Sequence, residues 1–314
     1  MGLEFIEGNE AIARGALKAN CNFFAGYPIT PSSSILNHMM NKLPRVGGVA
    51  IQAEDEIASI GMCIGAAMTG AKALTATSGP GISLYSENIG LAVIGETPLV
   101  IINVQRQGPA TGAATKGAEG DILFTRWCTS GGQPMIVLSP TSVSEAYELT
   151  YRAFNLAEKY RVPVFLLTNK EIGVTRESVD LEKVELPQLF NRKVSDMGDS
   201  YLPYKFKELN EVPDFAEIGG DQITRFTTSS HDEAGYLTTS PETIQRMIDH
   251  YTAKIESAED DIALAKQDIE VGAEILIISY GITSRSVNIA VKKMREQGCK
   301  VSSITVQSLY PVPR

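Results

Sequence analysis

The feature that most constrains the fold is a nearly continuous apolar run, Leu-Val-Ile-Ile-Asn-Val, within residues 98–104. A strand that is apolar on both faces needs cover on both sides, which is typical of parallel sheets flanked by helices. Other short apolar runs alternate with segments in which apolar residues recur at the helical period. The expected strands cover residues 21–25, 48–52, 72–77, 98–104, 134–138 and 163–168. This alternation predicts the α/β class, with an open parallel sheet and helices on both faces.

The chain is predicted to have three parts. Residues 1–185 carry the alternating pattern, with helices expected at 8–20, 33–42, 54–69, 78–95 and 142–159. Residues 186–270 form a connector, in which the pattern fades up to residue 240 and a charged helix is expected over 241–268. Residues 271–314 resume the alternation, and their expected elements are a strand at 274–279, a helix at 284–297 and a strand at 300–306.

Four polar segments each follow an expected strand. They are residues 27–30, 52–56 and 77–81, and Arg106. In open parallel sheets, ligands bind beyond the carboxyl ends of the strands. We therefore expect these four segments to meet at one rim of the sheet.

The first of these segments belongs to the run Gly-Tyr-Pro-Ile-Thr-Pro-Ser-Ser-Ser at residues 26–34. Pro28 and Pro31 fix their own φ angles and favour extended shapes for the residues before them. Thr30 is thereby held on a stiff corner in front of a helix that the serines at 32–34 can cap. A hydroxyl at such a corner can bind an anion. The alternative is a helix cap without a ligand.

Four motifs occur in a fixed order along the chain. They are Tyr-Pro-Ile-Thr-Pro-Ser-Ser from Tyr27, Ala-Glu-Asp-Glu-Ile from Ala53, Thr-Ser-Gly-Pro-Gly from Thr77, and Gln-Arg-Gln-Gly-Pro-Ala-Thr-Gly from Gln105. Together they resemble the α subunit of 2-oxoacid:ferredoxin oxidoreductases. The resemblance implies that residues 1–185 form a pyrimidine-type thiamine-diphosphate-binding domain. It also implies that residues 271–314 begin a transketolase C-terminal-like domain, which continues further in that family, so we expect a truncated chain.

Thiamine chemistry needs a carboxylate beside the aminopyrimidine ring of the cofactor, where it promotes the imino form of that ring. Glu54, Asp55 and Glu56 are the candidates. In the family pattern the glutamate stands five residues before a helix glycine, and Glu56 and Gly61 have that spacing. The resemblance therefore implies that Glu56 is the catalytic, cofactor-binding carboxylate. The alternative is that all three acids only favour the helix N-terminus.

The resemblance implies further contacts to cofactor and substrate. The other expected cofactor-binding residues are Tyr27, Pro28, Ile29, Ser78 and Gly79. Arg106 and Thr30 are expected to hold the 1-carboxylate of the substrate, because a guanidinium can bind a carboxylate through two parallel hydrogen bonds. The alternative for Arg106 is a surface ion pair with Asp121 or Glu119. Lys116 is a candidate for a second, distal carboxylate, and the alternative is a solvated lysine.

Half of a thiamine diphosphate site is absent from the sequence. No Gly-Asp-Gly motif is followed by Asn at the spacing that binds the magnesium, and the four cysteines are far apart in the chain. We therefore expect no metal in this chain. The resemblance implies a β subunit that carries Mg²⁺ and a [4Fe–4S] cluster, with the cofactor shared between the subunits. Coenzyme A is the implied co-substrate and ferredoxin the electron acceptor, with γ and δ subunits as further candidate partners.

The expected activity is oxidative decarboxylation of a 2-oxoacid to an acyl-CoA, CO₂ and reduced ferredoxin. We favour 2-oxoglutarate, with pyruvate, branched-chain and aryl 2-oxoacids as alternatives because residues 113–120 depart from the 2-oxoglutarate pattern. A noncatalytic structural subunit and a stand-alone nucleotide-binding protein are alternatives of other classes. A net charge of −9 argues against nucleic-acid binding. Neither a membrane-spanning run nor a signal peptide is seen, so we expect a cytoplasmic protein that does not contact a membrane.

Overall fold

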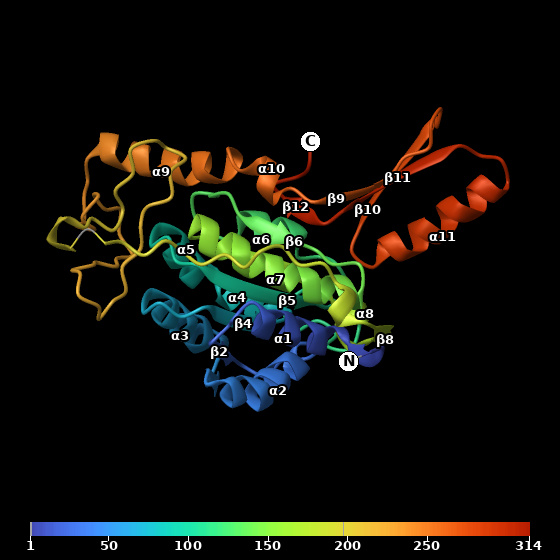
Figure 1. The fold of residues 1–314 in the computed structure, drawn as a ribbon, viewed down its shortest axis with the longest axis horizontal. Helices are drawn as coiled ribbons and strands as arrows, with labels where there is room; N and C mark the ends of the chain where they lie inside the picture. Colours follow the sequence, from blue (N-terminus) through green and yellow to red (C-terminus); the bar gives the residue numbers. More distant parts are fainter. Residues whose placement is uncertain (1, 197) are drawn as a thin grey trace.

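A computed structural model describes residues 2–196 and 198–314 of the chain (Figure 1). Its main sheet has seven strands: β2 (Phe23–Gly26), β3 (Val49–Gln52), β4 (Ala73–Thr77), β5 (Leu99–Gln105), β6 (Ile136–Leu138), β7 (Pro163–Asn169) and β12 (Ser308–Tyr310). The strand order is β12-β6-β7-β5-β4-β2-β3. All neighbouring strands run parallel except β12, which pairs antiparallel with β6. The predicted parallel α/β sheet is thus confirmed.

Helices cover both faces of this sheet, as the apolar run in β5 predicts. On one face lie α1 (Gly8–Lys18), α2 (Ser33–Lys42) and α7 (Val143–Tyr160), and on the other lie α3 (Glu56–Met68), α4 (Pro80–Leu84) and α5 (Ser86–Ile94). Each layer of helices has its own hydrophobic cluster, and all seven residues of β5 are buried between the two clusters. In the described part of the chain, no helix combines the length and the apolar character needed to cross a membrane.

Several short elements complete the rim and one edge of this body. They are β1 (Glu4–Glu7), η1 (Leu43–Val46), α6 (Ile122–Trp127), α8 (Lys170–Val174) and β8 (Arg176–Val179). The strands β1 and β8 pair antiparallel outside the main sheet. Neither strand was expected from the sequence, because each is only four residues long and mixes charged with apolar side chains.

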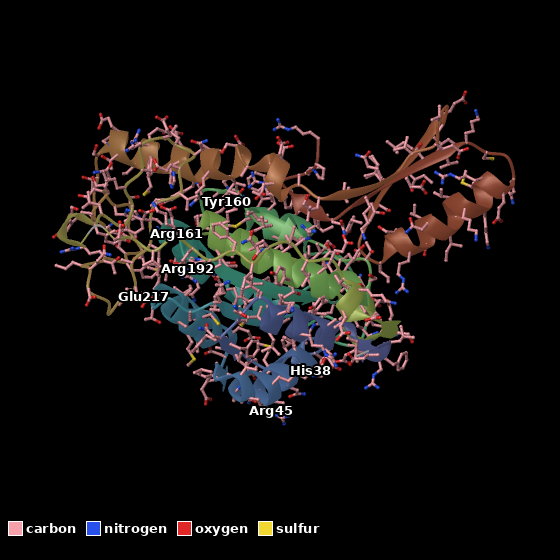
Figure 2. All side chains as sticks on the ribbon, in the orientation of Figure 1. His38, Arg45, Tyr160, Arg161, Arg192 and Glu217 are labelled. Atoms are coloured by element: carbon pink, nitrogen blue, oxygen red, sulfur yellow. The ribbon has the colours of Figure 1, made fainter. Side chains whose placement is uncertain are left out.

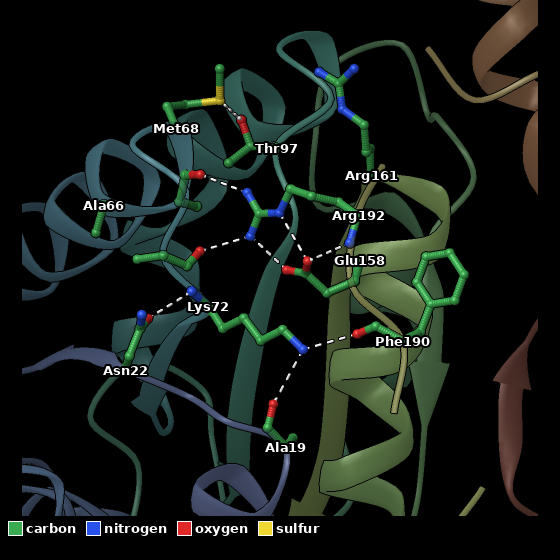
Figure 3. Close-up of polar contacts among 12 residues, drawn as sticks. Ala19, Asn22, Ala66, Met68, Lys72, Thr97, Glu158, Arg161, Phe190 and Arg192 are labelled. Atoms are coloured by element: carbon green, nitrogen blue, oxygen red, sulfur yellow. Dashed lines mark hydrogen bonds and ion pairs between the residues drawn. The ribbon is translucent and has the colours of Figure 1, made fainter. Parts of the chain in front are cut away.

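The connector has little regular structure before residue 241; its described part contains η3 (Gly198–Ser200), and η2 (Leu181–Lys183) lies just before it. Two buried arginines fasten it to the body, and Figure 2 labels both where the connector meets the helices. Arg161 donates hydrogen bonds to four carbonyl oxygens, those of Glu96, Pro203, Pro213 and Asp214. Arg192 pairs with Glu158, as Figure 3 shows. It also donates to the carbonyls of Ala67 and Ala71. These donors give hydrogen-bond partners to carbonyl groups in loops and at the end of α3.

The C-terminal part contains α9 (Pro241–Glu256), α10 (Glu259–Ile262), β9 (Ala265–Asp268), β10 (Ile275–Tyr280), α11 (Thr283–Glu296) and β11 (Val301–Val306). The last four form a separate unit, in which the sheet order is β10-β11-β9 (Figure 1). The predicted βαβ elements are confirmed. The helix predicted over 241–268 is wrong at its end, because the backbone leaves helical angles at Ala263 and residues 265–268 pair antiparallel with β11.

Candidate functional site

The segments that follow β2, β3, β4 and β5 meet at one rim of the main sheet. The strands are neighbours in parallel register, with Gly26 opposite Gln52 and Thr77 opposite Asn103. Contacts then join the segments themselves, because Arg106 reaches Thr30 and Gly81 lies against Glu56. The rim is therefore the candidate site that the sequence predicted.

The three consecutive acids at the start of α3 have three different environments. Glu54 is exposed. Asp55 is also exposed and is the N-cap, since its Oδ1 accepts a hydrogen bond of 2.7 Å from the backbone N–H of Ala58. Glu56 is the first residue of the helix and only 6% exposed. Helix capping thus accounts for Asp55 but leaves the burial of the Glu56 carboxylate unexplained.

The Glu56 carboxylate faces the backbone of the loop that follows β4. A Cβ atom built on Gly81 would lie 2.8 Å from Glu56 Oε1 and would also clash with Thr77 Oγ1. The close approach of these three residues therefore requires glycine at position 81.

Arg106 connects the segment after β2 to the loop after β5. Its Nη1 donates to Thr30 O at 2.6 Å and its Nη2 donates to Thr111 O at 2.9 Å. A Cβ on Gly79 would lie 2.5 Å from Arg106 Nε, and Gly79 also has a positive φ of 55°, so the guanidinium and this backbone fit only with glycine. The side chain is 6% exposed.

The alternative ion pairs of Arg106 are not made by the described residues. Asp121 instead accepts a hydrogen bond of 2.9 Å from Asn103 Nδ2, and Glu119 accepts one from Asn169 Nδ2. Burial raises the pKa of Asp121 although the Asn103 amide opposes this shift. The surface ion pair considered for Arg106 is therefore wrong.

The proline corner lies beside Arg106. Tyr27, Pro28 and Thr30 are exposed, and Ile29 is half-buried. Ser32 is the N-cap of α2, yet its hydroxyl makes no cap hydrogen bond and donates to Ile29 O at 2.9 Å instead. The expected serine cap is therefore not formed by this hydroxyl, which stabilises the corner.

Asn9 fixes the same corner from α1. Its Nδ2 donates to Pro31 O and to Ser34 Oγ, both at 2.8 Å, and its side chain is fully buried. Sequence reasoning missed Asn9, because nothing in its neighbourhood marks a contact to a segment more than twenty residues away. It also missed Thr77, Gly81 and Thr111. Thr77 and Gly81 are the first and last residues of the motif Thr-Ser-Gly-Pro-Gly, and the two glycines around Pro80 are a signal of close backbone approach.

Unpaired polar atoms gather at this rim. Among the described residues, Ser78 Oγ and Arg106 Nε are buried side-chain atoms without a hydrogen-bond partner. Buried polar atoms are nearly always paired, so two orphans on adjacent segments indicate a place for a polar ligand. With the buried Glu56 carboxylate, these residues fit the aminopyrimidine end of thiamine diphosphate.

Lys116 is not brought into this cluster. Its backbone closes the loop after β5, since its carbonyl accepts from the Gln107 N–H at 2.9 Å and its own N–H donates to Ala113 O at 3.0 Å. The side chain is exposed. No group of three or more His, Cys, Asp or Glu side chains suited to a metal is found in residues 2–196 and 198–314.

An open α/β sheet with a buried helix-start glutamate and orphaned polar atoms at its rim defines a ligand-binding domain of the type found in thiamine-dependent enzymes. Residues 14–250 match the family described as pyruvate flavodoxin/ferredoxin oxidoreductase, thiamine diphosphate-binding. Residues 273–314 match pyruvate:ferredoxin oxidoreductase core domain II. The chain belongs to this oxidoreductase family, which confirms the resemblance seen in its motifs.

Individual relatives are similar over most of the chain. The chain is 44% identical to 2-oxoglutarate synthase subunit KorA of Methanocaldococcus jannaschii, over 100% of this chain and 84% of that protein. It is 39% identical to the subunit of the same name from Archaeoglobus fulgidus, over 100% of this chain and 83% of that protein.

A solved structure has the same fold. It is a 2-oxoglutarate:ferredoxin oxidoreductase from Magnetococcus marinus with 2-oxoglutarate, coenzyme A and succinyl-CoA bound, and it superposes with a TM-score of 0.94 at 33% identity. The match covers 99% of this chain but 55% of that one. The present chain therefore spans little more than half the length of that solved relative.

Proposed function

We propose that this chain supplies the aminopyrimidine half of a thiamine diphosphate site in a complex that oxidatively decarboxylates 2-oxoglutarate. The observation that carries the proposal is the burial of the Glu56 carboxylate against Gly81 and Thr77, which helix capping does not explain. Thiamine diphosphate, when bound, supplies the electron sink that decarboxylation of a 2-oxoacid needs. In this account residues 1–185 are the cofactor domain, 186–270 the connector and 271–314 the start of the second domain.

Glu56 would hold its carboxylate beside the aminopyrimidine ring of the cofactor. A buried carboxylate there stabilises a proton on the facing ring nitrogen far better than an exposed one, because water does not screen it. The remaining cofactor contacts would come from the proline corner and the loop after β4. They are Tyr27, Pro28, Ile29, Ser78 and Gly79.

Arg106 and Thr30 would bind the 1-carboxylate of the substrate. The unpaired Nε of Arg106 is a free donor, and the exposed Thr30 stands beside the same guanidinium. Lys116 would meet the distal carboxylate of a dicarboxylic 2-oxoacid from the exposed loop after β5. Support for 2-oxoglutarate comes from the relatives named 2-oxoglutarate synthase and from the solved structure that holds 2-oxoglutarate.

A β subunit would complete the site. We assign the diphosphate, its Mg²⁺ and a [4Fe–4S] cluster to that partner, because the sequence lacks the motif that binds the magnesium and its four cysteines are far apart in the chain. One face of α3 supports a partner contact, since Ile57, Gly61, Met62 and Gly65 are all exposed, and nothing within the described chain lies within 4 Å of a Cβ built on either glycine. Small residues on a helix face allow another backbone to approach closely.

The proposed reaction uses coenzyme A as co-substrate and ferredoxin as electron acceptor. The coenzyme A and succinyl-CoA in the solved relative support this choice. Further γ and δ subunits are proposed as additional partners. We place the complex in the cytoplasm, where a reducing environment suits the four free cysteines of this chain.

The test is to purify the chain with its co-expressed partners and measure coenzyme A-dependent ferredoxin reduction with a panel of 2-oxoacids. We expect activity to be highest, in kcat/KM, with 2-oxoglutarate and to depend on added thiamine diphosphate and Mg²⁺. Activity that is highest with pyruvate or an aryl 2-oxoacid would contradict the substrate. A complex that turns over no 2-oxoacid, although it is intact and contains clusters, would point to a structural subunit.

A further inference from the structure

Two carboxylates hold the far end of the loop after β5: Asp121 is bound to Asn103 of β5, and Glu119 is bound to β7. The contacts of Glu119 also reach the C-terminal unit. Glu119 Oε1 accepts a hydrogen bond from Asn169 Nδ2. Asn169 is the last residue of β7, is 1% exposed, and is itself fixed because its Oδ1 accepts from the Ile172 N–H at 2.9 Å. The Glu119 carboxylate is therefore tied to a rigid position on the rim of the main sheet.

The C-terminal unit meets the same carboxylate from the other side. Tyr280 ends β10, and its hydroxyl lies near Glu119. Burial, together with the negative charge of Glu119, raises the pKa of Tyr280 to about 12. Gly281 has a φ of 56°, and a Cβ there would lie 2.6 Å from Glu119 Oε1. The turn between β10 and α11 is thus shaped around the Glu119 side chain.

Backbone hydrogen bonds make the loop a compact body that can transmit this contact. Gln107 bonds to both Ala113 and Lys116 at 2.9 Å, and Arg106 Nη2 bonds to Thr111 O. The far end returns to the sheet through Asp121, whose N–H donates to Gln105 Oε1 at 3.0 Å. A displacement of Glu119 therefore moves the segment that carries Lys116 and contacts Arg106.

We propose that Glu119 is a positioning residue through which the unit of β9, β10, α11 and β11 sets the position of loop 107–121. The coupling itself follows from the contacts above. Its consequence for the substrate rests on the proposed function, in which this loop presents Lys116 to the distal carboxylate. Glu119 does not contact substrate in this account and acts only through the loop.

The first arm of the test measures hydrogen exchange of loop 107–118 by mass spectrometry in the purified complex. Tyr280→Phe removes the hydroxyl near Glu119, and Glu119→Ala removes the carboxylate together with its hydrogen bond from Asn169. Both should increase exchange in the loop by about threefold to tenfold, the range expected from the loss of one hydrogen bond. Glu119→Gln keeps an acceptor for Asn169 and should restore most of the protection.

Glu177→Gln is the matched control, because it breaks the ion pair with Arg285 that fastens α11 to β8 without touching the loop. It should leave exchange in loop 107–118 unchanged. Equal exchange in wild type, Tyr280→Phe and Glu119→Ala would overturn the coupling, whatever the enzyme does. An increase for Glu177→Gln as large as that for Tyr280→Phe would also overturn it, because general loosening of the unit would then be the cause.

The second arm is kinetic. Tyr280→Phe should raise KM for 2-oxoglutarate by about threefold to tenfold with kcat changed less than about twofold, since a mispositioned loop weakens binding rather than chemistry. KM for pyruvate should rise less, because pyruvate lacks the distal carboxylate that Lys116 would meet and depends on the loop only through its contact with Arg106. Increased loop exchange with unchanged KM for every 2-oxoacid would support the coupling while contradicting the role proposed for Lys116, so the two claims fail separately.

Discussion

Arg106 combines observed structural contacts with the role that we propose for it in binding the substrate. Its two Nη atoms hold carbonyls of two different loops, at Thr30 and Thr111, and its Nε remains buried and unpaired. A side chain that only held the loops together would not leave a buried donor without a partner. The proposed bond to the substrate carboxylate would give this Nε a partner.

Replacing Arg106 should lower kcat/KM for every 2-oxoacid, because the 1-carboxylate is common to all of them. A charge-assisted hydrogen bond contributes roughly 1.5–3 kcal/mol, so Arg106→Ala should cost on the order of tenfold to a few hundredfold. Thr30→Ala should cost less, since a neutral hydrogen bond contributes about 0.5–1.5 kcal/mol. Arg106→Lys keeps the charge without the planar fork and should fall between. Unchanged kcat/KM in Arg106→Ala with both 2-oxoglutarate and pyruvate would make the arginine purely structural.

Lys116→Ala should discriminate between substrates. The exposed ammonium can add an attraction only when the 2-oxoacid carries a second carboxylate. We expect kcat/KM for 2-oxoglutarate to fall by about threefold to tenfold, as for a solvent-screened charge pair worth up to about 1 kcal/mol or slightly more. The value for pyruvate is the internal control and should stay constant. Equal losses with both substrates would indicate that Lys116 stabilises the loop and does not bind the distal carboxylate.

At the scale of elements, the turn from β4 into α4 determines how close the backbone can come to Glu56. Gly79 and Gly81 flank Pro80, and each lies where a Cβ would meet a site residue, Arg106 or Glu56. Any larger residue at position 79 or 81 would therefore clash with Arg106 or Glu56.

Gly81→Ala should severely lower kcat, because the added methyl group would displace Thr77 or the Glu56 carboxylate. An overpacked buried position typically costs about 1–3 kcal/mol of stability as well. Gly90→Ala is the matched control, since its Cβ would meet no atom closer than 3.8 Å and α5 accepts alanine readily. The measurements are kcat and melting temperature of the two variant complexes. Full activity in Gly81→Ala would show that the approach of this turn to Glu56 is not needed.

The sequence predicted some elements well and missed others, for physical reasons. β5 and β7 carry their own apolar runs, so their existence follows from local composition. β9, with the sequence Ala-Lys-Gln-Asp, is a strand only because β11 lies beside it, and the three residues of β12 depend on β6 in the same way. Tertiary pairing of this kind leaves no signal in a short polar segment.

The residues of the candidate site also differ in whether the sequence could predict them. Glu56 could be chosen over Glu54 and Asp55 from motif spacing. The contacts of Asn9 and Thr111 could not be predicted, because they join side chains to backbone carbonyls of distant segments.

At the scale of the whole molecule, a buried charge cluster ties the connector to the main body. Glu96 precedes β5, while His250 and Lys254 lie on α9, and all three are at most 2% exposed. Burial alone would raise the pKa of Glu96, but Lys254 and His250 outweigh it and hold that pKa well below its usual range. The ionised carboxylate therefore stabilises the docking of α9.

Glu96→Gln should lower the free energy of unfolding at pH 7 by about 3–5 kcal/mol, since it leaves a buried lysine unpaired. The folded-state pKa of Glu96 lies below its unfolded value of about 4.3. Its contribution is thus fully present above about pH 4.5 and is lost as the pH falls through the folded-state pKa. The free energy of unfolding, measured with urea between pH 3 and 7, should therefore fall less steeply with decreasing pH in the variant than in the wild type. The double variant Glu96→Gln, Lys254→Met should regain much of the lost stability. An unchanged urea midpoint in Glu96→Gln would contradict this account of the cluster.

The central claim is that Glu56 activates thiamine diphosphate from within this chain. The most direct measurement is the rate at which the C2 proton of the bound cofactor exchanges with deuterium in the assembled complex, compared for wild type, Glu56→Gln and Glu54→Gln. A positioned acid or base contributes roughly 10²–10⁴ in rate. The account predicts a loss of that order in Glu56→Gln, with bound cofactor retained, and a rate within about threefold of wild type in Glu54→Gln. Equal losses in the two variants, or wild-type exchange in Glu56→Gln, would contradict it.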